Sequence, residues 1–206
     1  MTTIYLMRHS EPFKKNLGIN DTHEELLFSN IKSPLSIDGE KFAETLSLTE
    51  EELQNIDVVW SSNYVRTMST AKWFTCRNNL KVNVTDKLGE RKHGIKSWDE
   101  LPPDFELRQY RDENYKIGNG ESRKETTDRI YSFICELLEN YKDKRILIVG
   151  HSTAFMFLLM KWCNVEYEGE YSFNDKVFFD GKWNYCETFK LEFNNKDLIN
   201  IENISQ

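Results

Sequence analysis

Residues 145–160 read RILIVGHSTAFMFLLM, and this stretch contains the unit that decides the fold. Ile146 to Val149 is a short apolar run of the kind that forms a buried strand. It ends at Gly150-His151-Ser152, and the apolar residues from Ala154 to Met160 predict a buried helix directly behind it. A buried strand that leads at once into a helix is typical of a parallel sheet covered by helices.

A strand that ends in a polar turn occurs twice more, nearer the N-terminus. Ile4 to Met7 predicts a first strand, which stops at Arg8-His9. Asp57 to Trp60 predicts a second strand, followed by Ser61-Ser62 and a helix over about 63–74. Parallel strands with such ends place their polar residues at one edge of the sheet, where ligands bind.

The remaining elements complete one predicted domain over residues 1–206. They are a helix from the Ser36 cap to about Leu48, a strand over Val82 to Thr85, a helix from the Ser122-to-Glu125 capping box to Tyr141, and a hairpin of 188–193 and 198–201. Residues 92–120 are predicted to be an irregular surface excursion. We therefore expect an α/β fold with a mostly parallel central sheet, helices on both faces and an antiparallel C-terminal edge hairpin.

Charge and cysteine content exclude several classes of protein. The 27 basic and 34 acidic residues give a net charge of −7, so a broad basic surface for nucleic acid or an anionic membrane is not expected. The four cysteines (Cys76, Cys135, Cys163 and Cys186) form no Cys-x-x-Cys pair, which argues against a zinc site. The apolar run before Arg8 is too short for a signal peptide, and we expect a cytoplasmic protein. The sequence does not indicate an oligomeric state.

Histidines and arginines gather at the predicted strand ends. His9 and His151 directly follow buried strands, Arg8 adjoins His9, and Arg66 falls in the first turn of a helix. A cation at a helix N-terminus is unfavourable beside the positive end of the helix dipole, and a bound anion would reverse that penalty. Each residue has an ordinary structural explanation when taken alone. Their coincidence, with Glu90 after the third strand, predicts a phosphate site.

The motifs that carry these residues resemble, in their order, the histidine phosphatase superfamily, the phosphoglycerate-mutase-like proteins. The resemblance covers nearly the whole chain and rests on Leu6-Met7-Arg8-His9, Pro34-Leu35-Ser36-x-x-Gly39, Ser61-Ser62-x-x-x-Arg66-x-x-x-Thr70-Ala71, Leu88-Gly89-Glu90-Arg91-x-x-Gly94, Gly120-Glu121-Ser122 and Val149-Gly150-His151.

The resemblance implies a role for each site residue. His9 would be the nucleophile that is phosphorylated, with its other ring nitrogen held by an acceptor such as a backbone carbonyl. Arg8 and Arg66 would bind the phosphate. Glu90 would be the general acid, and His151, if protonated, a third cation. Neither a metal nor a cofactor is implied.

Three positions depart from the family pattern. Ser10 and Ser152 each stand where the family usually has glycine beside the phosphate, and a positive φ at either would cost on the order of 1 kcal/mol. Asn16 stands one residue later than the family's substrate-contacting asparagine. Asn16 and Ser152 are therefore expected as substrate-binding residues on weaker grounds than the others.

The sequence favours a metal-independent phosphatase acting on phosphorylated small molecules. The alternative is a cofactor-dependent phosphoglycerate mutase, because Glu90-Arg91 resembles the mutase version of that motif. Family mutases carry a paired-arginine segment, whereas between Arg108 and Glu121 this chain has Arg108, Arg111 and Lys116 with no adjacent pair. A non-catalytic relative that binds phosphorylated ligands is less favoured, because both the nucleophile and the acid are present.

Overall fold

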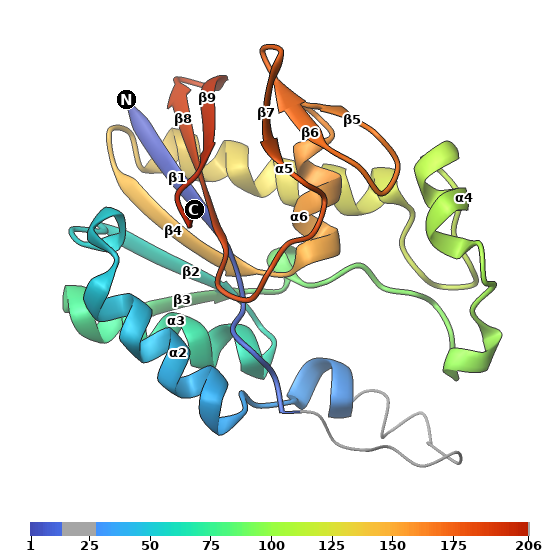
Figure 1. Ribbon diagram of the computed structural model, residues 1–206, viewed down its shortest axis with the longest axis horizontal. Coiled ribbons are helices and arrows are strands. Elements are labelled where there is room, and N and C mark those ends of the chain that lie inside the picture. The colour runs from blue at the N-terminus through green and yellow to red at the C-terminus, as the bar shows by residue number, and fades with distance from the viewer. Residues whose placement is uncertain (14–27, 206) are drawn as a thin grey trace.

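A six-stranded sheet in the order β3-β2-β4-β1-β8-β9 forms the centre of the protein (Figure 1). The computed structural model describes residues 1–13 and 28–205. The strands are β1 (Thr2–Arg8), β2 (Val58–Ser62), β3 (Val82–Thr85), β4 (Arg145–Gly150), β8 (Thr188–Asn194) and β9 (Asp197–Asn203). The first four run parallel, while β8 is antiparallel to β1 and β9 to β8. The predicted parallel sheet with an antiparallel edge hairpin is confirmed.

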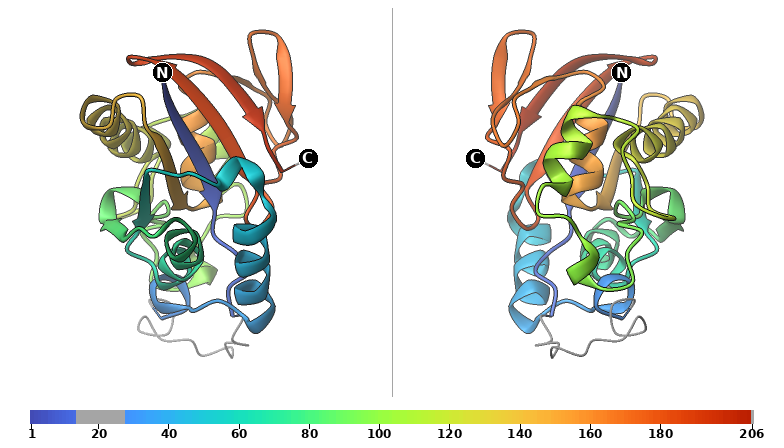
Figure 2. Two further views of the ribbon diagram at one scale, coloured as in Figure 1. Left: turned by 90° about the vertical axis from the view of Figure 1, so that its left-hand side faces the viewer. Right: turned by 90° about the vertical axis from the view of Figure 1, so that its right-hand side faces the viewer.

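Helices cover both faces of this sheet (Figure 2). One face carries α2 (Ile37–Thr49) and α3 (Val65–Asn78), and the other carries α5 (Arg123–Asn140) and α6 (Ser152–Leu159). The predicted caps are present. The side chain of Ser36 accepts a hydrogen bond from the backbone N–H of Gly39, and Ser122 and Glu125 form the capping box of α5.

A hydrophobic core lies on each face of the sheet, and the central strands β1 and β4 contribute side chains to both. They can do so because successive side chains of a strand point to opposite faces. Ile4 and Leu6 of β1 pack with the α5 and α6 side of the sheet. Tyr5 and Met7 pack with the α3 side, against Ala71 and Phe74. A strand buried on both faces reads as a continuous apolar run, which explains the sequence pattern. The predicted one-domain organisation over 1–206 stays a prediction.

The C-terminal half holds elements that the sequence pattern did not indicate. A small sheet is formed by β5 (Asn164–Val165), β6 (Tyr171–Phe173) and β7 (Lys176–Phe179). The segment predicted as irregular contains α4 (Phe105–Arg111), so that prediction was wrong for these residues. Short helical turns occur at Phe28–Lys32, Glu51–Leu53, Asp86–Leu88 and Trp98–Glu100. Within the described ranges, no helix is both long and apolar enough to cross a membrane.

Candidate active site

The register of β1 and β4 brings the two predicted histidines together. Arg8 pairs with Gly150 in the parallel ladder, so His9 and His151 leave the sheet at the same level. The N–H of His9 donates to the Gly150 carbonyl at 3.0 Å. The centroids of the two imidazole rings lie 5.4 Å apart. The pairing of β1 with β4 thus brings together two histidines that are more than a hundred residues apart in the sequence.

His9 is held as a neutral imidazole in one defined tautomer. Its Nδ1 lies 2.7 Å from the backbone carbonyl of Ser10, which can only accept, so Nδ1 carries the proton. The predicted contact with a backbone carbonyl is confirmed. Burial, reinforced by the positive charges of Arg66 and Arg8, lowers the pKa of His9 to about 3. The lone pair of Nε2 is therefore available at neutral pH.

His151 is fully buried and joined to Arg66. The Arg66 guanidinium donates to Nδ1 of His151 at 3.2 Å, so Nε2 is the protonated nitrogen and faces Ser62 Oγ at 2.9 Å. The Ser62 hydroxyl in turn lies 2.7 Å from that of Thr67. Burial, followed by the charge of Arg66, lowers the pKa of His151 well below its ordinary value. That His151 acts as a third cation when it is protonated stays a prediction.

The two arginines reach the site from different elements, and each stacks on a tyrosine. Arg66 comes from the first turn of α3, and its guanidinium lies 4.9 Å from the ring centroid of Tyr64. Arg8 ends β1, lies 4.4 Å from the ring centroid of Tyr185, and donates to the Trp183 carbonyl. Its buried Nε has no hydrogen-bond partner among the described residues.

Both guanidinium groups are partly or wholly removed from water, because Arg66 is buried and Arg8 is half-buried. Burial lowers the pKa of Arg8 and of Arg66, and the negative charge of Glu90 opposes that shift at both. Two desolvated cations around one imidazole pair are costly unless an anion offsets them. The arrangement therefore suits a bound oxyanion, for which arginine offers paired N–H donors.

Glu90 follows the helical turn after β3 and is half-buried. Its Oε1 accepts hydrogen bonds from the backbone N–H groups of Arg91 (2.8 Å) and Ala154 (2.9 Å). Ala154 lies in the first turn of α6, so this carboxylate caps the helix that begins after His151. The Glu90 carboxylate is thereby bound to the start of α6, three residues after His151.

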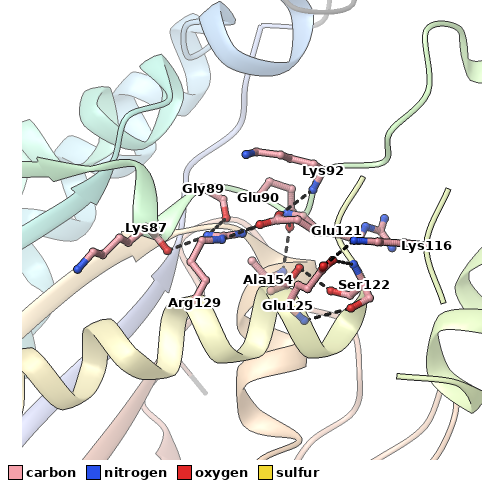
Figure 3. A network of polar contacts seen from close by, with 12 residues as sticks. Lys87, Gly89, Glu90, Lys92, Lys116, Glu121, Ser122, Glu125, Arg129 and Ala154 are labelled. Carbon is pink, nitrogen blue, oxygen red and sulfur yellow. Dashed lines mark hydrogen bonds and ion pairs between the residues drawn. The ribbon is translucent and has the colours of Figure 1, made fainter. Parts of the chain in front are cut away.

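The segment that carries Glu90 is clamped by an ion pair (Figure 3). Arg129 of α5 donates to the carbonyls of Lys87 (2.7 Å) and Gly89 (3.2 Å). It also forms a bidentate pair with Glu121, at 2.8 and 2.9 Å. Glu121 accepts the backbone N–H of Lys92 at 3.1 Å. Backbone groups on both sides of Glu90 are therefore bound by one charged pair.

Arg91, the residue after Glu90, is held by α4. Its side chain is buried, and its guanidinium donates to both carboxylate oxygens of Glu106 (2.8 and 2.9 Å). It also donates to Gln109 Oε1 and His93 Nε2, each at 2.7 Å, and lies 5.0 Å from the ring centroid of Phe105. Its buried Nε has no hydrogen-bond partner among the described residues. Arg91 therefore ties α4 to the segment that carries Glu90.

The two serines that replace family glycines are accommodated without backbone strain, since neither has a positive φ. Ser10 is buried and donates from Oγ to the Gly39 carbonyl at 2.7 Å. Ser152 begins α6 and is half-buried. Packing explains why position 150 is a glycine, because a Cβ there would lie 2.3 Å from the ring of Phe155. Asn16 lies outside the described residues.

Sequence reasoning missed the groups that orient the site. Tyr64 and Tyr185 stack on the arginines, and Arg129 with Glu121 clamps the Glu90 segment. Gly120-Glu121-Ser122 was a family motif without a role, and that motif was the available signal for Glu121. Among the described residues, no three His, Cys, Asp or Glu side chains gather in a way that could hold a metal ion.

Comparison with known proteins identifies relatives over most of the chain. The profile of the histidine phosphatase superfamily (branch 1) matches residues 4–177. Phosphoserine phosphatase 1 of Hydrogenobacter thermophilus is 26% identical over 182 residues, which cover 84% of this chain and 82% of that protein. The uncharacterized phosphatase PhoE of Bacillus subtilis is 27% identical over 161 residues, covering 77% and 76%.

Solved structures share the fold. YhfR of Bacillus stearothermophilus superposes with a TM-score of 0.69 at 18% identity, covering 97% of this chain and 95% of that one. A mycobacterial glucosyl-3-phosphoglycerate phosphatase in complex with vanadate gives a TM-score of 0.68 at 16% identity, covering 98% and 96%. With the family profile matching residues 4–177, the chain belongs to the histidine phosphatase superfamily, in its branch 1.

Proposed function

We propose that this protein is a metal-independent phosphatase that hydrolyses phosphomonoesters of small metabolites through a phosphohistidine on His9. The observation that carries the proposal is the state of His9. Its Nδ1–H is bound to a carbonyl and its pKa is lowered to about 3, which leaves Nε2 unprotonated near the buried Arg66 and the half-buried Arg8. A neutral imidazole that faces bound phosphate is a competent nucleophile.

In the first half-reaction, Nε2 of His9 attacks phosphorus as the bond from phosphorus to the ester oxygen breaks. Arg8 and Arg66 bind the equatorial oxygens, whose charge must be stabilised during transfer. The His151 ring, 5.4 Å from that of His9, is fixed by Arg66 and Ser62. A bound dianion would raise the pKa of His151, so the residue gains positive charge as the phosphate binds.

Glu90 is the proposed proton donor. In its acid form it gives a proton to the leaving oxygen and becomes a carboxylate. That carboxylate then takes a proton from water, whose oxygen attacks phosphorus and breaks the bond to Nε2. Phosphate leaves, and both His9 and Glu90 return to their starting states. Glu90→Gln should lower kcat within the range of about 10² to 10⁴-fold that general acid catalysis contributes.

The mutase alternative is less well supported. A mutase would have to hold a second acidic group of its substrate, and Arg91 of the mutase-like Glu90-Arg91 pair would be the natural cation. Arg91 is instead buried and paired with Glu106. In α4, Arg108 pairs with the exposed Asp104. The relatives found by sequence are also named as phosphatases, one of them for phosphoserine.

One experiment tests the proposal directly. Purified protein is incubated with p-nitrophenyl phosphate and excess EDTA, and hydrolysis is followed with time. We expect turnover and, after an acid-free quench, a phosphoenzyme that is stable to alkali and lost in acid. Absence of hydrolysis with intact folded protein would favour the non-catalytic relative, and stimulation by a bisphosphoglycerate would favour the mutase. Substitution of His9 should remove the phosphoenzyme.

A further inference from the structure

The last loop before β8 folds around Arg8. In the antiparallel pairing of β8 with β1, Thr188 lies opposite Met7. The residues just before β8 therefore lie beside the residue that ends β1, as Figure 1 shows for the loop that leads into β8. We call the segment from Trp183 to Glu187 the Arg8 clip. It lies outside residues 4–177, the part of the chain that the family profile matches.

The Arg8 clip contacts both the backbone and the side chain of Arg8. The N–H of Arg8 donates to the Glu187 carbonyl at 3.2 Å, and the carbonyl of Arg8 accepts from the Cys186 N–H at 3.1 Å. One terminal nitrogen of the guanidinium donates to the Trp183 carbonyl. The ring centroid of Tyr185 lies 4.4 Å from the guanidinium carbon. The clip thus holds Arg8 at its backbone, at one end of the guanidinium and over the guanidinium face.

The clip is itself fixed by buried polar groups. One carboxylate oxygen of Glu187 accepts from the Asn184 N–H, and the other accepts from Nδ2 of Asn203 in β9, each at 2.6 Å. The indole N–H of Trp183 donates to the Glu187 carbonyl at 2.7 Å. Glu187 and Trp183 are both buried, and a hydrogen bond is stronger in such surroundings than in water.

The backbone of the clip is strained at one residue. Cys186 has a φ of 56°, in the left-handed region that residues with a side chain rarely adopt. Such a conformation costs on the order of 1 kcal/mol or more, and it persists where surrounding contacts determine it. The Cys186 N–H binds Arg8, and its carbonyl accepts from Thr188 Oγ1 at 2.8 Å. Strain of this kind is concentrated at functional sites, and here it lies between Tyr185 and the start of β8.

The clip leaves one donor of Arg8 for a ligand. The buried Nε of Arg8 has no hydrogen-bond partner among the described residues. A buried donor without a partner is costly, and a phosphate oxygen would satisfy it with a charge-assisted hydrogen bond. A planar guanidinium that already lies against a ring also loses less freedom when it binds an anion.

We propose that Tyr185 is a positioning residue, whose ring holds the guanidinium of Arg8 in the orientation that binds the phosphate oxygens. The inference rests on the phosphate-binding role that the proposed function gives to Arg8. The ring centroid of Tyr185 lies 6.0 Å from that of His9, so the stacked pair borders the proposed nucleophile. Stacking requires the aromatic ring and not the hydroxyl group.

Binding of inorganic phosphate, measured by calorimetry on the purified protein, tests the proposal without requiring turnover. Tyr185→Leu removes the ring and should weaken phosphate binding by about threefold or more, the scale of one cation–π contact. Tyr185→Phe keeps the stacking and should bind phosphate within about twofold of the parent. Equal affinities in Tyr185→Leu and the parent would overturn the inference, and so would equal losses in the two variants.

Tyr131→Leu is the matched control. Tyr131 is half-buried, as Tyr185 is, and it also faces a cation, with Lys161 Nζ 4.1 Å from its ring centroid. It lies in α5 and has no contact with Arg8. Its substitution should leave phosphate affinity unchanged. An equal loss in Tyr131→Leu would show that the effect of Tyr185→Leu is not specific to Arg8.

A double-mutant cycle shows whether Tyr185 acts through Arg8. In protein that carries Arg8→Gln, the further change Tyr185→Leu should weaken phosphate binding by less than about twofold, because the guanidinium that the ring positions is gone. The full loss in both backgrounds would mean that Tyr185 acts independently of Arg8, which overturns the inference.

Hydrolysis of p-nitrophenyl phosphate by the parent separates this result from the proposed function. A parent that binds phosphate and does not hydrolyse the ester would contradict the proposed function, while the comparison of phosphate affinities would still decide the role of Tyr185. A parent that does not bind phosphate would overturn the inference.

Discussion

Two walls of the active site are built by different means. The strand wall consists of His9 and His151, which follow directly on β1 and β4, and of Arg66, which lies in the first turn of α3 after β2. The loop wall is the segment 87–121, which carries Glu90. Backbone hydrogen bonds position the strand wall, such as the one from the His9 N–H to the Gly150 carbonyl. Side-chain ion pairs position the loop wall, namely Arg129 with Glu121 and Arg91 with Glu106.

This difference matters for the effects of mutations. Sheet register is shared by many backbone hydrogen bonds, so one distant side chain has little influence on the strand wall. The loop wall depends on single charged side chains, and displacement of a catalytic group by about 1 Å can cost on the order of 10²-fold in rate. Residues far from the phosphate should therefore control Glu90 and leave His9 unaffected.

The largest expected effect is the difference in activity between variants of the buried His9 in the strand wall and the half-buried His93 in the loop wall. His9→Ala removes the proposed nucleophile and should lower kcat on the order of 10⁶-fold, the scale seen when other enzymes lose theirs. His93→Ala removes an imidazole that accepts a hydrogen bond from Arg91, and kcat should stay within about tenfold of the parent. Steady-state hydrolysis of p-nitrophenyl phosphate measures both.

The unfolding midpoint of each variant is the control, because a variant that loses activity by unfolding would also show a lower midpoint. Comparable losses in the two folded variants would show that His9 has no special role. Near-parental turnover by His9→Ala would remove the mechanism altogether.

The sequence predicted the strand wall more fully than the loop wall, for a physical reason. Apolar runs that end in Arg8-His9 and Gly150-His151 mark strand ends. Parallel pairing of those strands then places the residues that follow them at one edge of the sheet. The loop wall is built by long-range side-chain contacts, such as that between Arg129 and Glu121, which leave no periodic pattern. The sequence thus indicated Glu90 itself and missed what holds it.

The protonation of His151 shows a second limit of sequence reasoning. The family resemblance implied a third cation only if His151 is protonated, and the sequence does not reveal the burial that governs protonation. The structure places the ring fully inside the protein, with Arg66 donating to it. Desolvation lowers the pKa of the ring, and a bound anion acts in the opposite direction.

The second prediction tests the clamp on the loop wall. Arg129→Lys keeps the charge but cannot span both carbonyls and Glu121, because lysine lacks the planar fork. We expect kcat to fall about tenfold with KM nearly unchanged, since Glu90 acts after the phosphate is bound. The pH dependence of kcat should change as well, which a purely structural role would not produce.

Arg108→Lys is the matched control for this prediction. Arg108 makes an exposed pair with Asp104 within α4, at 2.8 Å, and its guanidinium lies 5.6 Å from the ring centroid of Tyr115. Among the described residues, its side chain has no hydrogen bond or ion pair with residues 87–92, which flank Glu90. Exposed pairs of this kind contribute little. A kcat for Arg129→Lys equal to that of Arg108→Lys would mean that Glu90 is positioned by other contacts.

The smallest expected effect is on the pH dependence of stability, to which the strand wall contributes through His9 and the loop wall through His93. Burial lowers the pKa of His9 to about 3 and that of His93 to about 4, whereas unfolded histidine titrates near 6.5. The unfolded chain therefore binds more protons below about pH 6.5, and the free energy of unfolding must fall as pH falls. Each fully buried neutral histidine contributes a slope of at most about 1.4 kcal/mol per pH unit.

Urea unfolding between pH 7 and 5 measures this slope above the range in which most carboxylates titrate. His9→Gln and His93→Gln should each flatten it by nearly the same amount, because both folded-state pKa values lie below this pH range. Glutamine cannot take up a proton, so the lost slope reports the replaced histidine alone. An equal slope in His9→Gln and the parent would mean that His9 is charged in the folded protein, and a charged imidazole could not attack phosphorus.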